Sequence, residues 1–210
     1  RVIVAPLASF KNNGNYERED FIFNYLASRF FIARNTAVVN CWHKNEYESE
    51  SMWRIYSEST GVAIKTNARK LIECITDPRK NDVKMKNVIY MDFEKCDPVH
   101  VQVSEENNYA PLFKRMCFEH EREVRLYYYL DLSFKEIEEK KNTNSMPRGI
   151  ELDIDPDILI EEVYVSPYAR ETYEKSVRAI MKSFGYGDQR VKNSTLLAPS
   201  EQFKRLIFEK

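Results

Sequence analysis

An acidic, strand-like segment from Phe118 to Tyr129 sets the strongest condition on how this 210-residue chain can fold. Side chains two residues apart share one face of a strand. One surface is then predicted to carry Glu119, Glu121, Glu123 and Arg125. The opposite, core-facing surface is predicted to carry Val124, Leu126 and Tyr128. Acids aligned on one face repel each other unless cations neutralise them or they belong to a functional site. We therefore expect a functional site at this strand.

Lys114 and Arg115 precede these acids, and three interpretations of the cluster stay open. In the first, a carboxylate binds ribose hydroxyls or stabilises an oxocarbenium cation, while Lys or Arg binds a phosphate. In the second, Asp92 and one of the glutamates hold Mg²⁺ for phosphodiester hydrolysis. A nuclease would place a Lys where Arg125 stands, and Arg cannot act as a base. In the third, cross-strand ion pairs lie on a solvated face.

Composition narrows the function classes. Thirty-two basic and thirty-three acidic residues give a net charge of −1, so no overall field attracts nucleic acid or an anionic membrane. The chain has five glycines and neither a Gly-x-Gly-x-x-Gly nor a Gly-x-x-x-x-Gly-Lys pattern, which argues against ordinary dinucleotide and P-loop sites. No apolar run approaches the ~20 residues that span a bilayer. We expect a cytoplasmic protein with no membrane partner.

The four cysteines form no Cys-x-x-Cys pair, and only three histidines accompany them. A structural zinc site is therefore not expected, and we predict no bound metal. The cysteines are interpreted as reduced thiols of a cytosolic protein. The chain opens at Arg1 without an initiator Met, so we expect upstream sequence, a first strand included, to be missing.

Apolar periodicity predicts short helices interspersed with strands. The predicted helices are Glu17–Arg29, Met52–Tyr56, Ala68–Ile75, Lys135–Asn144 and Ala169–Phe184, with a helical turn at Pro111–Phe118. The predicted strands are Thr36–Trp42, which we expect to be buried, Val62–Lys65, Val83–Phe93 with a hairpin partner at Pro98–Val103, Gly149–Ile154, Ile160–Ser166 and Gln189–Leu196. This order predicts one globular α+β domain over residues 1–210, with a mixed, mostly antiparallel sheet and a long C-terminal amphipathic helix.

Both tryptophans lie in one short region, Trp42 beside His43 and Trp53 beside Tyr56. Such a corner can form an aromatic-walled pocket that stacks a flat heterocycle, or it can be ordinary core packing. Cys41 is two residues from His43, so an imidazolium could lower its pKa and make it a nucleophile. The apolar run before Cys41 favours a small buried core residue instead.

Five motifs together resemble a widespread bacterial and phage family known as a domain of unknown function, sometimes found near defence genes. They are Asn40-Cys41-Trp42-His43, the Met52-Trp53-x-x-Tyr56 helix, Gly61-Val62-Ala63-Ile64, Phe118-Glu119-His120-Glu121-x-Glu123-Val124-Arg125, and Val163-x-Val165-Ser166-Pro167. The resemblance covers Thr36 to Ser194 and implies no biochemistry.

A second, weaker likeness is to ADP-ribosyltransferase-like folds. Those enzymes place an Arg or His on a first strand, an aromatic or Ser on a second, and a Glu, often in Glu-x-Glu, on a later strand. The likeness implies that Glu121 or Glu123 steadies the ribosyl cation, while Trp53 or Tyr56 stacks nicotinamide. No first-strand Arg or His can be assigned near the N-terminus, which leaves upstream residues to supply it.

We therefore expect an ADP-ribosyltransferase-like enzyme acting on a nucleotide or nucleic-acid-linked substrate, in phage defence or as a toxin, with NAD as candidate substrate. The predicted catalytic residues are Glu121 and Glu123, and the predicted substrate-binding residues are Trp42, His43, Trp53, Tyr56, Lys114, Glu119 and Arg125. The alternatives are a non-catalytic module that senses a ligand or protein partner, and a magnesium-dependent nuclease.

Overall fold

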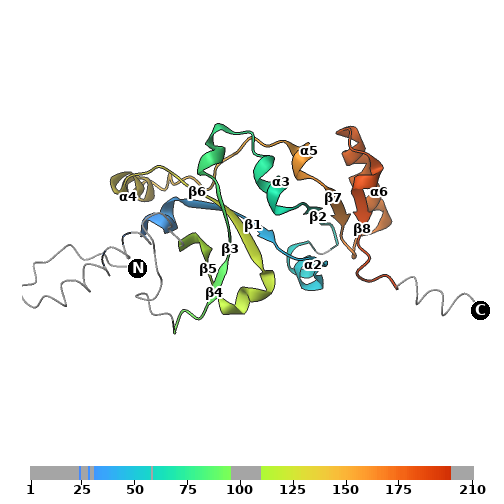
Figure 1. Ribbon diagram of the computed structural model, residues 1–210, viewed down its shortest axis with the longest axis horizontal. Coiled ribbons are helices and arrows are strands. Elements are labelled where there is room, and N and C mark those ends of the chain that lie inside the picture. The colour runs from blue at the N-terminus through green and yellow to red at the C-terminus, as the bar shows by residue number, and fades with distance from the viewer. Residues whose placement is uncertain (1–23, 25–27, 29–30, 58, 96–109, 200–210) are drawn as a thin grey trace, which may run out of the picture. The chain divides into compact units, whose positions relative to one another are not determined.

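The structure is a computed structural model that describes residues 24, 28, 31–57, 59–95 and 110–199. Helices accompany sheets in which most strand pairs are antiparallel and two are parallel, which confirms the α+β class with mixed, mostly antiparallel pairing (Figure 1). The chain divides into two compact units, each built from two stretches. Unit 1 comprises Arg1–Lys44 and Asn81–Glu151, and unit 2 comprises Asn45–Lys80 and Leu152–Lys210. The single domain over the whole chain stays a prediction.

Unit 1 is built on a three-stranded antiparallel sheet. Residues 31–36 are helical and lead into β1 (Ala37–His43). β6 (Glu123–Tyr129) is the central strand, between β1 and β3 (Lys84–Asn87), as Figure 1 shows. β4 (Ile89–Met91) and β5 (Phe113–Arg115) form a separate parallel pair. The short 3-10 helices η2 (Ala110–Leu112) and η3 (Met116–Glu121) flank β5.

α4 (Phe134–Asn142) completes unit 1. A capping box starts this helix, because the Ser133 side chain accepts from the Glu136 backbone N–H and the Glu136 carboxylate accepts from that of Ser133. Ile137 is fully buried, and the ring centroids of Phe134 and Phe31 are 5.0 Å apart, so these two apolar residues anchor a helix that is otherwise mostly charged. In the described part of this unit the buried apolar residues are Ala33, Val83, Val88, Leu112, Tyr127 and Ile137.

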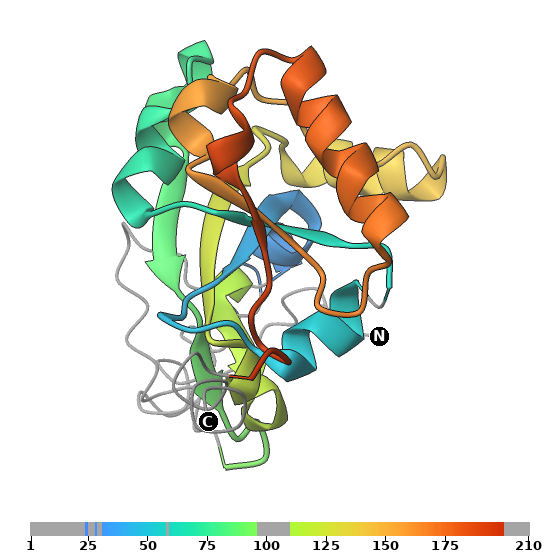
Figure 2. The same ribbon diagram turned by 90° about the vertical axis from the view of Figure 1, so that its right-hand side faces the viewer.

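Unit 2 contains a second three-stranded sheet. In it β7 (Glu162–Val165) pairs antiparallel with β2 (Val62–Lys65) and parallel with β8 (Val191–Asn193). The helices are α2 (Glu50–Tyr56), α3 (Ala68–Glu73), α5 (Pro156–Leu159) and α6 (Glu171–Ser183), with 3-10 helices η1 (Pro78–Asp82), at the boundary of the two units, and η4 (Asp188–Arg190). Figure 2 shows α6 alongside this sheet.

Residue chemistry explains where the helices of unit 2 begin and end. Ser49, Asn67 and Asp155 cap α2, α3 and α5 by accepting from backbone N–H groups in the first turn. α6 has 13 residues and ends before Gly185, whose φ of 86° suits a residue without a Cβ. The long C-terminal amphipathic helix stays a prediction, because no residue of α6 is buried, and Ile180 of the predicted apolar stripe is exposed, as is Phe184 just after the helix.

Several expectations about secondary structure are wrong. Val83–Phe93 is two strands rather than one, because Val88 breaks the ladder and its N–H donates to the Glu123 carbonyl. Pro111–Phe118 contains strand β5 between two 3-10 helices. Gly149–Ile154 is no strand and contributes an isolated bridge from Ile154 to Ile75. β1 is exposed in its middle, and within the described residues it stands at the edge of its sheet. Pro98–Val103 and nearly all of Glu17–Arg29 lie outside the described residues.

The acidic segment itself differs most from its prediction. Glu119 and Glu121 lie in η3, and the strand begins only at Glu123. Glu123 and Tyr127 are buried, whereas Val124, Leu126 and Tyr128 are half-buried, so the charged face is the more buried one.

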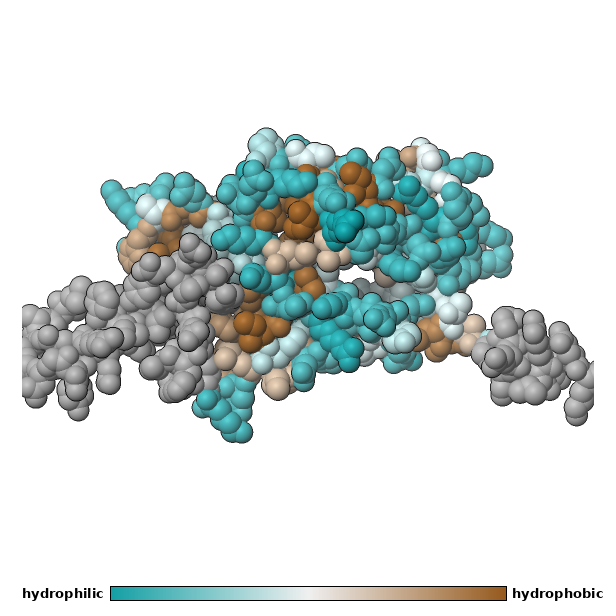
Figure 3. All heavy atoms as spheres, in the orientation of Figure 1, coloured by the Kyte–Doolittle hydropathy of each residue, from teal (hydrophilic) through white to brown (hydrophobic). Residues whose placement is uncertain are grey.

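Hydrophilic side chains cover most of the face shown in Figure 3. No helix of the described residues is both long and apolar enough to cross a bilayer.

Candidate functional site

A buried ionic cluster joins β5, η3 and β6 in unit 1. Lys114 Nζ lies 2.8 Å from Glu121 Oε2 and 2.7 Å from Glu123 Oε1. Arg125 binds the other oxygen of Glu123, with Nε at 2.8 Å and Nη2 at 2.6 Å from Oε2. The two glutamate side chains are only 7% and 8% exposed. Both predicted catalytic residues, and the predicted Lys114 and Arg125, therefore meet in one place.

Local backbone geometry creates this cluster. Because η3 ends at Glu121 and β6 begins at Glu123, the two carboxylates point to one cation although the helix–strand junction separates them. Arg125 also donates through Nη1 to the Pro111 carbonyl at 2.5 Å, which ties β6 to the turn before β5. Buried charges are tolerated only when they are paired and hydrogen-bonded, and these four are.

The cluster controls the charge of Glu123. Burial raises the pKa of this carboxyl, but the hydrogen bonds from Lys114 and Arg125, with a contribution from the Glu121 carboxyl, outweigh burial and lower the pKa to about 2. Burial lowers the pKa of Lys114, and its hydrogen bonds to the two glutamates outweigh that effect, so the net shift is upward. Glu123 is thus a carboxylate and Lys114 an ammonium at neutral pH. Neither is poised to exchange a proton there.

His43 faces this cluster from the neighbouring strand. In the β1–β6 register His43 stands directly opposite Glu123, and Cys41 stands opposite Arg125. Directly paired residues of antiparallel strands share a face. His43 Nδ1 lies 2.6 Å from the Glu121 carbonyl oxygen, which can only accept, so Nδ1 carries the proton. Nε2 is buried and has no hydrogen-bond partner among the described residues.

Cys41 does not gain an activating partner from His43. Desolvation of the thiol raises its pKa, and the nearby Arg125 guanidinium, which lowers it, only partly offsets this effect. A raised pKa leaves little thiolate at neutral pH. The structure therefore offers no support for a nucleophilic Cys41, although the residue is exposed rather than buried.

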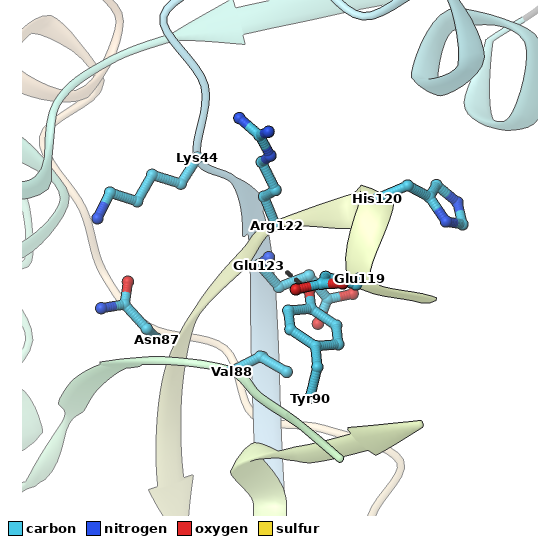
Figure 4. A pocket seen from close by; sticks show the side chains of 8 residues that line it. All are labelled: Lys44, Asn87, Val88, Tyr90, Glu119, His120, Arg122 and Glu123. Carbon is cyan, nitrogen blue, oxygen red and sulfur yellow. Dashed lines mark hydrogen bonds between the residues drawn. The ribbon is translucent and has the colours of Figure 1, made fainter. Parts of the chain in front are cut away.

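A cavity of about 640 Å³ opens beside the cluster. It is lined by Lys44, Asn87, Val88, Tyr90, Glu119, His120, Arg122 and Glu123, all within unit 1. Figure 4 shows Glu119, Glu123 and Tyr90 gathered together, Lys44 and Arg122 extending on another side, and His120 apart from them. The Tyr90 hydroxyl accepts the Glu123 backbone N–H at 2.8 Å, which fixes the ring beside the strand. The volume is within the range of ligand pockets.

The predicted aromatic corner is divided between the units. Trp42 is in β1, half-buried, and its Nε1 donates to Asn40 Oδ1. Trp53 belongs to unit 2, is 6% exposed, and donates to Glu48 Oε2 at 3.0 Å, as a core indole does. Tyr56 of unit 2 is 63% exposed. A common binding site for these aromatics and the glutamates stays a prediction.

No metal centre is apparent in the part of the chain that the structure describes, where no three His, Cys, Asp or Glu side chains are grouped to share an ion. Asp92, the acid of the nuclease interpretation, lies 3.4 Å from Lys95 Nζ and accepts from the Glu94 backbone N–H. These contacts are those of a capped turn.

Sequence reasoning found Glu119 and Glu123 of the cavity and missed the other six lining residues. Lys44 directly follows β1 and is two residues from Trp42. That closeness to the predicted aromatic corner was only a weak signal that Lys44 lines a binding site. Arg122 was visible in the acidic segment but was assigned to a strand. Its left-handed backbone, with φ of 41°, is not predictable for an Arg.

Comparison with known proteins assigns one stretch. Residues 52–126 match the family model described as Protein of unknown function (DUF2971). This DUF2971 stretch contains most of α2 of unit 2 and the whole ionic cluster of unit 1, and it confirms the resemblance to a domain of unknown function over these residues. No curated protein and no solved structure matches the chain. The likeness to ADP-ribosyltransferases stays a prediction.

Proposed function

We propose that unit 1 carries an ADP-ribosyltransferase-like site that uses NAD, with Glu123 as the catalytic carboxylate at the cavity. The observation that carries the proposal is the pairing of His43 with Glu123 on adjacent strands. The sequence offered no first-strand Arg or His for the likeness, and β1, the first strand of the described residues, supplies one. Glu123 also lines the cavity in which a ligand would lie.

The charge state of Glu123 suits one step of this reaction. In ADP-ribosyl transfer the bond between nicotinamide and ribose C1′ breaks, and its electron pair leaves with neutral nicotinamide. The ribose is left cationic until a nucleophile bonds to C1′ and loses its proton to solvent water. A carboxylate with a lowered pKa remains charged and can stabilise that cation. The acceptor that fits the expectation is a nucleotide or a nucleic-acid group.

A non-catalytic, ligand-sensing module is the second candidate, and a specific observation favours it. Both oxygens of Glu123 already bind cations, Lys114 at Oε1 and Arg125 at Oε2. These cations weaken the field that a developing ribosyl cation would experience. The same cavity would then bind a nucleotide, and nothing would react.

One experiment separates the two candidates. The full chain is incubated with NAD, and released nicotinamide and the shift in melting temperature are measured for wild type and Glu123→Gln. Transferase activity predicts that wild type releases nicotinamide, that Glu123→Gln does not, and that NAD still shifts the melting temperature of both. A sensing module predicts the shift without release from either. Absence of any shift in wild type at millimolar NAD would refute both.

Glu119→Gln is the matched control. Glu119 lines the same cavity, but it lies outside the ion pairs with Lys114 and Arg125. Replacing Glu119 tests whether nicotinamide release depends on any carboxylate of the cavity or on Glu123 in particular. Because Glu119 lines the cavity and is a predicted substrate-binding residue, the proposal expects Glu119→Gln to raise the KM for NAD and to keep the kcat of nicotinamide release, which Glu123→Gln loses. Circular dichroism of each variant establishes that Glu123→Gln is folded before its activity is compared.

A further inference from the structure

Two cations of the cavity lining have no charged partner among the residues that the structure describes. Lys44 and Arg122 make no side-chain hydrogen bond or ion pair with any residue that the structure describes, and both are exposed. Glu123, by contrast, is neutralised by Lys114 and Arg125. Glu119 is the remaining acid of the lining. The cavity therefore has cationic groups in excess of the acids available to balance them.

The backbone holds these two cations next to each other. The Lys44 N–H donates to the Arg122 carbonyl at 2.9 Å, and the Arg122 N–H donates to the Glu119 carbonyl at 3.0 Å. Arg122 has a left-handed backbone, with φ of 41°, which is costly for a long side chain. Among the described residues, the other non-glycine residue with a left-handed backbone is Asn144, of a type that tolerates this conformation. Strain of this kind is concentrated at functional sites.

Neutral donors complete the same cavity. The Asn87 amide lies on the Lys44 side of the opening in Figure 4. The Tyr90 hydroxyl accepts from the Glu123 N–H, and its own proton goes to no acceptor among the residues described. A hydroxyl that accepts one bond still has one to donate. Two cations with neighbouring neutral donors match the several oxygens and the charge of a phosphate or pyrophosphate group.

We propose that Lys44 and Arg122 form a phosphate subsite, so that the cavity takes a phosphorylated small nucleotide rather than a nucleoside. This inference rests on the proposed function and specifies its substrate class. The phosphates bind on the side of Lys44 and Arg122, and the sugar hydroxyls lie toward Glu119, Glu123 and Tyr90. The cavity volume accommodates a ligand of this size.

The test compares the binding of ADP, inorganic pyrophosphate and adenosine to the full chain by isothermal titration calorimetry. Wild type is expected to bind ADP at least about tenfold more tightly than adenosine, and added salt is expected to weaken ADP binding. Lys44→Gln and Arg122→Asn are each expected to weaken ADP and pyrophosphate binding by about tenfold and to leave adenosine binding unchanged. Asn is chosen because it tolerates the left-handed backbone of residue 122.

Matched controls are Lys135→Gln and Arg148→Asn, at exposed cations of unit 1 that do not line the cavity. The subsite is refuted if these controls weaken ADP binding as much as the cavity variants do, or if the cavity variants bind ADP like wild type. It is also refuted if wild type binds neither ADP nor pyrophosphate at millimolar concentration. Tighter binding of a single-stranded oligonucleotide than of ADP, lost in the same variants, would overturn the assignment to a small nucleotide.

Failure of the subsite and failure of the transferase give different results. ADP binding that depends on Lys44 and Arg122, without nicotinamide release from NAD, supports the subsite and removes the transferase. Nicotinamide release with an unchanged KM for NAD in Lys44→Gln and Arg122→Asn removes the subsite and keeps the transferase.

Discussion

Lys114→Met is expected to destabilise the folded protein strongly, because Lys114 is the shared partner of two buried carboxylates. Removing one member of a buried ion pair costs about 3–5 kcal/mol. Two features reduce that cost here. The Lys114 side chain is 20% exposed, so water can replace part of it, and Arg125 still holds Glu123. We therefore expect a loss of about 2–3 kcal/mol near neutral pH, measured by urea denaturation followed by circular dichroism.

The same variant has a defined pH dependence. The pKa of Glu123 is lowered from the ordinary 4.5 to about 2 in the folded protein, so this carboxylate stabilises the fold above 4.5 and loses its contribution as the pH falls toward 2. Lys114→Met removes a main cause of that shift. The stability difference between wild type and variant should therefore be largest near neutral pH and should shrink as the pH falls from 4.5 toward 2.

Lys135→Met is the control for the lost lysine, because its side chain is 87% exposed and lies 3.8 Å from Glu139. It is expected to change stability by less than about 0.5 kcal/mol. Lys114→Arg should retain most of the stability. The reasoning is refuted if Lys114→Met is as stable as Lys135→Met, or if its deficit is the same at neutral and acidic pH.

Three further predictions concern the backbone. Gly61→Ala should destabilise the protein by about 1–3 kcal/mol in the same urea assay, because a Cβ there would lie 2.0 Å from Ser57 Cβ. Gly149→Ala is the control, since a Cβ there would meet no atom within 4 Å, and equal effects of the two substitutions would contradict the prediction. Gly185→Ala should cost about 1 kcal/mol, since its φ is 86°, and an unchanged urea midpoint would be inconsistent with the helix end described. Arg122→Gly should stabilise by about 1 kcal/mol while weakening ADP binding; lower stability would show that Arg122 is not strained.

The elements of the fold that the sequence predicted best are those with a strong local cause. α4 and α6 have clear periodicity or caps, and β7 and β2 are short apolar runs bounded by turns. The range of β2 is therefore as predicted, and the other three ranges differ from the prediction by a few residues. The acidic segment was mispredicted because alternation alone indicated a strand. The 3-10 helix η3 and the left-handed Arg122 interrupt that alternation, and no local signal marks them.

The burial of the charged face had a different cause. A sequence pattern ranks side chains by polarity, and it therefore assigned Val124 and Leu126 to the core in preference to Glu123 and Arg125. Lys114 and Arg125 donate hydrogen bonds to the carboxylates of Glu121 and Glu123, and these bonds allow the two glutamates to be buried. The bonds depend on contacts between β5 and β6. Lys44 was missed for the same reason. The role of a single exposed cation depends on the residues that the fold places beside it, and the sequence pattern does not show these neighbours.

The most direct test of the proposed site is a crystal structure of the full chain with ADP-ribose. This ligand is the part of NAD that remains after nicotinamide has left, and it keeps the reacting ribose and both phosphates. The account predicts that the phosphates contact Lys44 and Arg122 and that the ribose hydroxyls lie beside Glu123. A ligand bound outside this cavity, or the reverse orientation with phosphates at Glu119 and Glu123, would contradict it.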